Sequence, residues 1–147
     1  MPKKVLISIY DSHDDGTDKY NSELTTVGTL SGAADDYSLV YTETNEAMVG
    51  CVTTLRVING KKVVLTRTGG YDTEMVIERN CRHNCYYETP FGEFMMGIYA
   101  NDVRSDYGEN GGKVEMQYTI DFNTGLASVN KLRIDFQEAQ SNGINNQ

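Results

Sequence analysis

The chain has 147 residues, a formal net charge of −8 and 39% hydrophobic residues. This length fits one domain that can bury a sizeable core without a metal or a disulfide. The negative charge excludes nucleic acid and anionic membrane surfaces as partners, because both attract basic patches. No stretch has the length and apolar character of a signal peptide or a membrane span. Three cysteines, an odd number, indicate reduced thiols, and we expect a cytoplasmic location.

The first half of the chain is predicted to form short strands. They are expected over Val5–Tyr10, Glu23–Ser31, Tyr37–Glu43, Gly50–Ile58 and Lys61–Arg67, with an acidic loop over Asp11–Asp18 and a connection with room for one helical turn over Thr44–Val49. Asn59-Gly60 is a strong hairpin signal because both residues tolerate a positive φ. A two-residue loop would pair Ile58 with Lys61, and Arg56 would then share a face with Arg67.

The second half continues the pattern. Strands are expected over Thr73–Arg79, Arg82–Glu88, Phe94–Tyr99, Val114–Phe122 and Ala127–Phe136, with turns at Thr89–Gly92 and Asn123–Gly125 and the longest loop over Asn101–Gly112. Phe94–Tyr99 is apolar on both faces, which predicts a strand covered on both sides. Val114–Phe122 alternates strictly and is the clearest half-buried strand. We expect a single domain over 1–137 and a polar tail over 138–147.

Roughly ten strands spaced by about 8–12 residues, with no convincing helix, indicate an all-β protein. Almost every connection is short enough for a hairpin, which favours an antiparallel up-and-down sheet. Closing such a sheet removes its exposed edges. The sequence therefore predicts a closed antiparallel barrel of about 8–10 strands.

Several short motifs occur in an order and spacing that resemble a known family. They are Y-T-E at Tyr41–Glu43, T-T-L at Thr53–Leu55, L-T-R-T-G at Leu65–Gly69, E-M-V-I-E at Glu74–Glu78, Y-E-T-P-F-G-E-F at Tyr87–Phe94, G-K-V-E-M-Q-Y from Gly112 and S-V-N-K-L-R-I from Ser128. Together they resemble a YwiB-like family of small bacterial proteins, common in Firmicutes, which is a domain of unknown function placed among calycin-like or lipocalin-like β-barrels. The resemblance implies a barrel that can hold an interior cavity, and it implies no function.

Glu43 and Arg67 are the first candidates for a ligand site. If their strand faces both point inward, a carboxylate or phosphate ligand can take the place of Glu43 beside the guanidinium. Tyr41, Tyr86, Tyr99 and Tyr118, with Met95 and Met116, are the candidate lining. The alternative is an ion pair at the rim that contributes little, above a core that the protein's own side chains fill.

Metal and catalytic motifs have little support. Cys81, His83 and Cys85 alternate along one strand, where positions about 6.6 Å apart do not converge on one zinc ion, and Cys51 would have to supply a fourth ligand. The Asp11–Asp18 loop lacks the glutamate that an EF-hand needs at its last position. We predict no metal and no cofactor.

The leading functional hypothesis is a cytoplasmic protein that binds a small, partly apolar or anionic ligand in the barrel interior or mouth. A structural or protein-interaction module with a filled core is the alternative. An enzyme of unknown reaction is third, because no catalytic motif is present.

Overall fold

The computed structural model describes residues 2–43, 50–69, 72–89, 92–122 and 127–139, and these form ten strands. The strands are β1 (Lys3–Asp14), β2 (Lys19–Ala33), β3 (Asp36–Thr42), β4 (Val52–Ile58), β5 (Lys62–Thr68), β6 (Thr73–Glu78), β7 (Arg82–Thr89), β8 (Gly92–Tyr107), β9 (Gly111–Phe122) and β10 (Ala127–Glu138). No helix that could cross a membrane occurs in these ranges.

Each strand pairs antiparallel with its neighbour in sequence, and β1 also pairs with β10, so the sheet closes on itself. The prediction of an all-β, antiparallel, up-and-down barrel is therefore confirmed, with ten strands at the upper end of the expected range. The weakest seam lies between β6 and β7, where Thr73 and Tyr87 are the one pair in register among the described residues.

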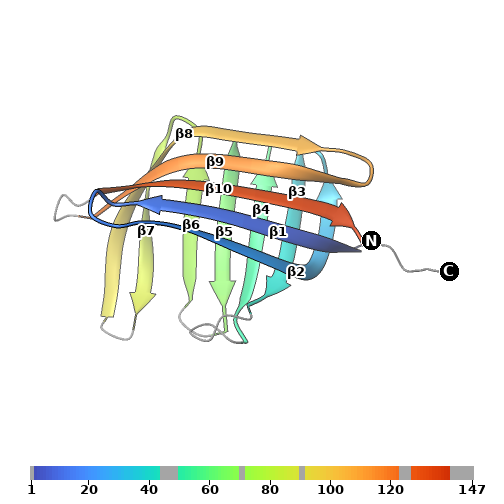
Figure 1. The fold of residues 1–147 in the computed structure, drawn as a ribbon, viewed down its shortest axis with the longest axis horizontal. Coiled ribbons are helices and arrows are strands. Elements are labelled where there is room, and N and C mark those ends of the chain that lie inside the picture. The colour runs from blue at the N-terminus through green and yellow to red at the C-terminus, as the bar shows by residue number, and fades with distance from the viewer. Residues whose placement is uncertain (1, 44–49, 70–71, 90–91, 123–126, 140–147) are drawn as a thin grey trace.

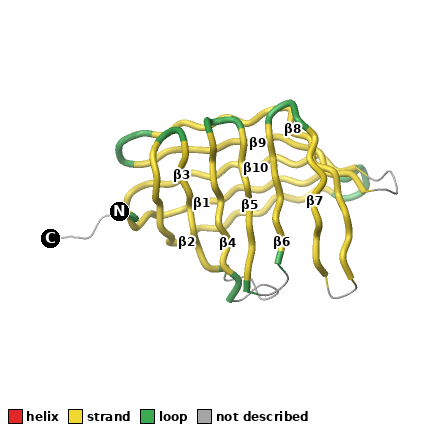
Figure 2. Tube along the Cα trace, turned by 180° about the vertical axis from the view of Figure 1, so that it is seen from behind, coloured by secondary structure: helices red, strands yellow, loops and turns green. Residues whose placement is uncertain are grey.

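The barrel is flattened into two layers whose strands cross steeply. In Figure 1, β9, β10, β1, the larger part of β2 and the second part of β8 run across the view in front, while β3 to β7 and the first part of β8 run vertically. Figure 2 shows the second layer from the other side. The long strands β8 and β2 turn the corners between the layers, as expected for orthogonally packed sheets. In β8 the corner coincides with a shift of register between Ala100 and Asp102, which makes Asn101 a β-bulge.

The space between the layers is a packed core rather than an open lumen. Inward-facing side chains of seven strands are at most 1% exposed, among them Val5, Ile7, Tyr37, Leu39, Leu55, Val57, Val63, Ile77, Ile98, Val103 and Val114. Close packing at this density leaves little room for a ligand at the centre. Any binding site must therefore lie at an end of the barrel or on its outer face.

The stretch predicted as the longest loop, Asn101–Gly112, is mostly strand, so this prediction was wrong. β8 continues to Tyr107 and β9 begins at Gly111, which confines the turn to residues 108–110. The segment looks like a loop in the sequence because its outer face is polar. Its inner face carries the fully buried Val103 and the Ser105 hydroxyl, which hydrogen-bonds Tyr37 Oη at 2.6 Å.

The predicted hairpin at Asn59-Gly60 is confirmed, and both residues have a positive φ, 54° and 67°. Its predicted register was wrong by one residue. Lys61 belongs to the turn, so Ile58 pairs with Lys62 instead.

The corrected register separates the two arginines that were expected to share a face. Thr53 lies opposite Arg67, and Arg56 lies opposite Val64. Arg56 points to the outer surface, where its guanidinium lies 2.7 Å from the Asp36 carboxylate. The interior therefore holds one arginine from this hairpin, and the cost of burying two does not arise.

The expectation that Phe94–Tyr99 is covered on both sides was also wrong. Met96 and Ile98 are buried, whereas Met95 and Tyr99 on the other face are each 39% exposed. Both faces of this strand are apolar, and composition alone does not show which face packs inward.

Two strands are longer than predicted, and several predicted turns lie outside the described residues. The predicted acidic loop is shorter, because β1 extends to Asp14, and β10 includes Glu138 from the predicted tail. The proposed helical turn at Thr44–Val49, the centre of the Thr89–Gly92 turn, the Asn123–Gly125 turn and most of the tail fall outside the described residues.

Candidate functional site

A layer of polar side chains occupies one end of the barrel, next to the apolar core. Cross-strand pairing places Tyr41 opposite Thr53, Thr53 opposite Arg67, and Arg67 opposite Thr73. All four lie on the inward face, because the inward residues two positions further in, such as Leu39 and Leu55, are 1% exposed. Four successive strands therefore each contribute one polar side chain to the same inward-facing row.

Glu43 follows directly after β3 and is drawn into this layer. Its backbone amide donates to the Cys51 carbonyl oxygen at 2.8 Å, which fixes the end of the β3–β4 pairing. Its side chain is 8% exposed. Thr53 Oγ1 donates a hydrogen bond of 2.5 Å to Glu43 Oε2. The predicted inward position of Glu43 on the face of Tyr37, Leu39 and Tyr41 is thus found.

Arg67 completes the layer and makes longer contacts. Its Nη2 lies 3.5 Å from Glu43 Oε2, and its Nε donates to Thr53 Oγ1 at 3.4 Å. Its side chain remains 19% exposed, against 8% for Glu43. A guanidinium has five N–H donors, and its two contacts with described residues use Nη2 and Nε alone.

The electrostatics of the layer favour a neutral Tyr41. Burial, followed by the nearby Glu43 carboxylate, raises the pKa of Tyr41 to about 12. Its hydroxyl therefore remains protonated at any physiological pH and is available as a hydrogen-bond donor beside the acid. The layer offers a donor, a carboxylate and a guanidinium within one row, which is a set suited to a polar or anionic head group.

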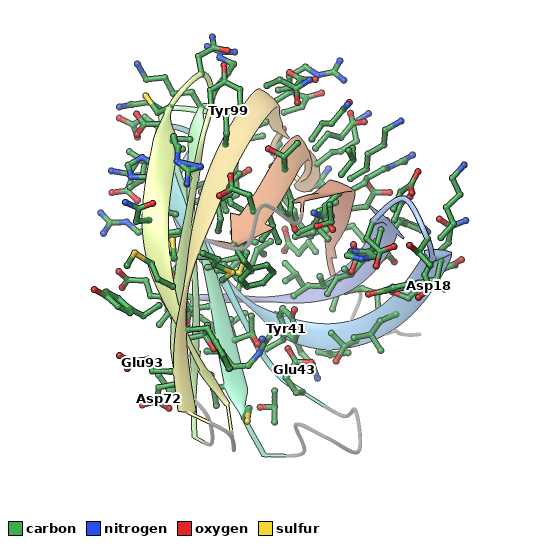
Figure 3. All side chains as sticks on the ribbon, turned by 90° about the vertical axis from the view of Figure 1, so that its left-hand side faces the viewer. Asp18, Tyr41, Glu43, Asp72, Glu93 and Tyr99 are labelled. Atoms are coloured by element: carbon green, nitrogen blue, oxygen red, sulfur yellow. The ribbon has the colours of Figure 1, made fainter. Side chains whose placement is uncertain are left out.

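Figure 3 looks along the barrel and shows Tyr41 and Glu43 together on the inner side of β3, between the two layers. Tyr99 lies near the top of the same view, well away from them. Tyr99 and Tyr86, 39% and 59% exposed, belong to the outer face of β7 and β8, together with Met95. These three residues do not line the interior, which corrects their predicted position.

Tyr118 and Met116 do point inward, from β9 in the other layer, and are 7% and 3% exposed. Burial raises the pKa of Tyr118 well above its ordinary value, with further contributions from Asp11 and Tyr20. Tyr118 therefore faces a different polar group from the one around Arg67.

Residues of β1, β2 and β10 form this second polar group. His13 Nδ1 hydrogen-bonds Asn130 Oδ1 at 2.8 Å, and the His13 and Tyr20 rings stack with centroids 5.0 Å apart. Burial raises the pKa of the Asp11 carboxyl, and nearby His13 opposes the shift. This group is absent from the predicted site because the sequence predicts Asp11 and His13 in an acidic loop, whereas both belong to β1.

The cysteines and His83 do not assemble into a site. His83 Nε2 lies 2.8 Å from Glu78 Oε1, while the buried Cys85 accepts a hydrogen bond from the Val76 amide at 3.4 Å. Cys81 is exposed. Within the described ranges, no group of three or more His, Cys, Asp or Glu side chains is placed to hold a metal ion.

Thr53 is the member of the layer that sequence reasoning overlooked. The signal was the hairpin register: once Lys61 is counted in the turn, Thr53 falls opposite Arg67. A buried threonine between an acid and an arginine is then the expected bridging donor.

Comparison with known proteins places this architecture in a family. Residues 7–134 match the family model described as "Domain of unknown function (DUF1934)". The chain belongs to this family. A crystal structure of the YwiB protein from Bacillus subtilis has a similar fold, with a TM-score of 0.82 at 16% sequence identity, covering 95% of this chain and 94% of that one. At this identity the similarity concerns the fold alone. Comparison with curated proteins gave no match.

Proposed function

We propose that the protein binds a small anionic amphiphile at the polar end of the barrel, with Arg67 as the anchor for the anionic group. The observation that supports this most is the unequal pairing in the layer. Thr53 gives Glu43 a short hydrogen bond, whereas Arg67 has contacts of 3.4 and 3.5 Å and stays 19% exposed. An incoming carboxylate can form a bidentate pair with this guanidinium without displacing a tight partner.

Apolar side chains at the same end of the barrel suit the rest of such a ligand. Phe94 and Phe122 face the same end of the barrel through the β7–β8 and β8–β9 pairings, and they are 48% and 38% exposed. Exposed aromatic rings at the same end of the barrel as a charged group give a ligand both an apolar surface and an anchor. The three free cysteines support a reducing, cytoplasmic setting for this binding.

Calorimetric titration with decanoate tests the proposal, with decyltrimethylammonium as the ligand of similar tail and opposite charge. We expect decanoate to bind and the cation to bind much more weakly. Arg67→Gln should weaken decanoate binding about tenfold to a hundredfold, the range expected when one charged hydrogen-bonded partner is lost.

Arg56→Gln is the matched control, since Arg56 lies on the same hairpin but on the outer face, paired with Asp36. It should leave decanoate affinity unchanged. Equal decanoate affinity in the wild type and Arg67→Gln, or equal affinity for both ligands, would remove Arg67 as the anchor.

A second candidate function is protein interaction through the outer face of β7 and β8. Tyr86, Met95 and Tyr99 are all more than a third exposed there, and Tyr86 pairs directly with Met95. Such residues are enriched at protein interfaces. The packed core favours this alternative over any binding at the barrel centre.

A further inference from the structure

Among the described residues, β2 carries an open strand edge along most of its length. Its fifteen residues pair with β1 from Lys19 to Leu30 without a shift of register. On its other side β3 pairs with Thr29–Ala33 alone. Within the described part of the chain, Lys19–Gly28 therefore has one neighbouring strand. Figure 1 shows this part of β2 as the lower border of the front layer.

The divergence from β3 begins at Gly28. A Cβ at this position would clash with the Val40 carbonyl oxygen and lie 2.7 Å from Ile7 Cδ1 and 3.1 Å from Tyr41 Cβ. The two strands are thus pressed together at Gly28 and separate towards Lys19. At its Gly28 end, the edge therefore stops where β2 packs tightly against β3.

This edge has few of the usual protections against strand addition. Natural sheets shield a free edge with lysine and other charged side chains, proline, a bulge or a short strand, and the charged residues of this edge are Lys19 and Glu23. Lys19–Gly28 contains no proline, its pairing with β1 has no bulge, and Val27 on the outer face is 49% exposed. A long and regular edge with one neighbouring strand among the described residues is a ready template for a further strand.

We propose that Lys19–Gly28 binds an extended, basic segment of a partner protein by β-strand addition. The charge of the surroundings selects a basic partner. Lys19 lies 3.9 Å from Asp14, so its charge is compensated, and Glu23 remains on the edge. The adjoining hairpin carries Asp15 and Asp18, and the whole chain has a net charge of −8.

A second copy of this chain fits the edge less well. Antiparallel pairing of two β2 edges over Lys19–Val27 places Glu23 directly opposite Glu23 of the other copy. Like charges opposite each other destabilise a strand pair, and two chains of charge −8 repel each other. The edge therefore favours a different molecule.

The alternation along β2 defines the sequence that would bind. Leu24 and Thr26 are half-buried and face inward, while Asn21, Glu23 and Thr25 are exposed and face outward. The added strand should therefore place apolar side chains at alternate positions beside Leu24 and Thr26. Its other positions should carry lysine or arginine beside Glu23.

Selection from a display library of short random peptides on the intact protein tests this. We expect enriched peptides to alternate apolar and basic residues. In backbone amide exchange, their synthetic copies should protect amides of Lys19–Gly28. Glu23→Lys should weaken their binding roughly tenfold or more by reversing the charge on the edge, and Val27→Lys should weaken it as well.

Arg67→Gln should leave peptide binding unchanged, which separates this site from the proposed amphiphile site. The proposal is overturned if no peptide is enriched, if the protected amides lie elsewhere, or if Glu23→Lys binds as well as the wild type. Concentration-dependent dimerisation of the wild type that Glu23→Lys alters would also overturn it, since the edge would then serve a second copy.

Discussion

Thr53 Oγ1 donates a hydrogen bond of 2.5 Å to Glu43 Oε2, and the two side chains are 0% and 8% exposed. This bond explains how a carboxylate is held at the barrel end with a salt-bridge partner 3.5 Å away. Burying a carboxylate is costly unless it is hydrogen-bonded or paired. Thr53 thus carries part of the stabilisation that a closer arginine would otherwise supply.

Thr53→Val should therefore destabilise the fold although it keeps the side-chain shape. The variant removes the donor and leaves Glu43 under-satisfied, at a cost of about 1–3 kcal/mol in the free energy of unfolding. Urea denaturation followed by circular dichroism measures this change. Thr53→Ser retains the hydroxyl and serves as the control. A Thr53→Val variant as stable as the wild type would contradict the bridging role of Thr53.

Two glycines should respond very differently to replacement by alanine. A Cβ on Gly28 meets the Val40 backbone and the Ile7 side chain in the core, whereas a Cβ on Gly97 meets the guanidinium at the end of the long Arg82 side chain on the surface. Gly28→Ala should cost about 1–3 kcal/mol through overpacking.

Gly97→Ala should cost well under 1 kcal/mol, because it disturbs the surface ion pair of Arg82 with Asp121. Thermal unfolding of both variants gives the comparison. A larger loss for Gly97→Ala than for Gly28→Ala would contradict the packing described at the β2 corner.

Stability should fall at alkaline pH because of Tyr37. Burial raises the pKa of Tyr37 to about 12, while an unfolded tyrosine has a pKa of about 10. The folded state then holds the proton more strongly, so the stabilisation is complete below about pH 10 and is lost as pH rises to about 12.

The loss amounts to about 2–3 kcal/mol, two pKa units at about 1.4 kcal/mol each. Urea denaturation at a series of pH values measures it. Tyr37→Phe is less stable at neutral pH because Ser105 loses its partner, but its stability should decline less steeply above pH 10. An equally steep decline in both proteins would show that Tyr37 is not responsible.

Thiol reactivity should distinguish one cysteine from the other two. Cys81 is exposed, whereas Cys51 and Cys85 are 6% and 4% exposed. Alkylation of the native protein should modify one thiol quickly and two slowly, and Cys81→Ser should remove the fast phase. Two or more fast thiols in the native protein would contradict the burial of Cys51 or Cys85.

The sequence was sufficient for the architecture because the signals that determine it are local. Alternation over Tyr37–Glu43 and Val114–Phe122 identified inward faces, and both are buried along most of their length. Asn59-Gly60 located a hairpin. These patterns arise from the period-two geometry of a strand and need no knowledge of the other layer.

The predictions that failed depended on contacts between distant segments. After the bulge at Asn101, β8 remains paired with β9 along the polar stretch from Asp102 to Tyr107. No local pattern in the sequence indicates this bulge. Tyr86 and Tyr99 were assigned to the interior because nothing in an apolar strand tells which face meets the second layer. The Glu43–Arg67 pair was predicted correctly. The position of Thr53 opposite Arg67 could be recognised only once the hairpin register was known.

A crystal structure of the protein grown with decanoate tests the central claim most directly, because it shows where the carboxylate sits. The account predicts density for the carboxylate within hydrogen-bond distance of the Arg67 guanidinium, with the alkyl chain against Phe94 or Phe122. A rival location is the recess of about 540 Å³ on the outer face of the front layer, lined by side chains such as Tyr10, Lys131 and Arg133. Decanoate found there, with the end of the barrel around Arg67 vacant, would contradict the account.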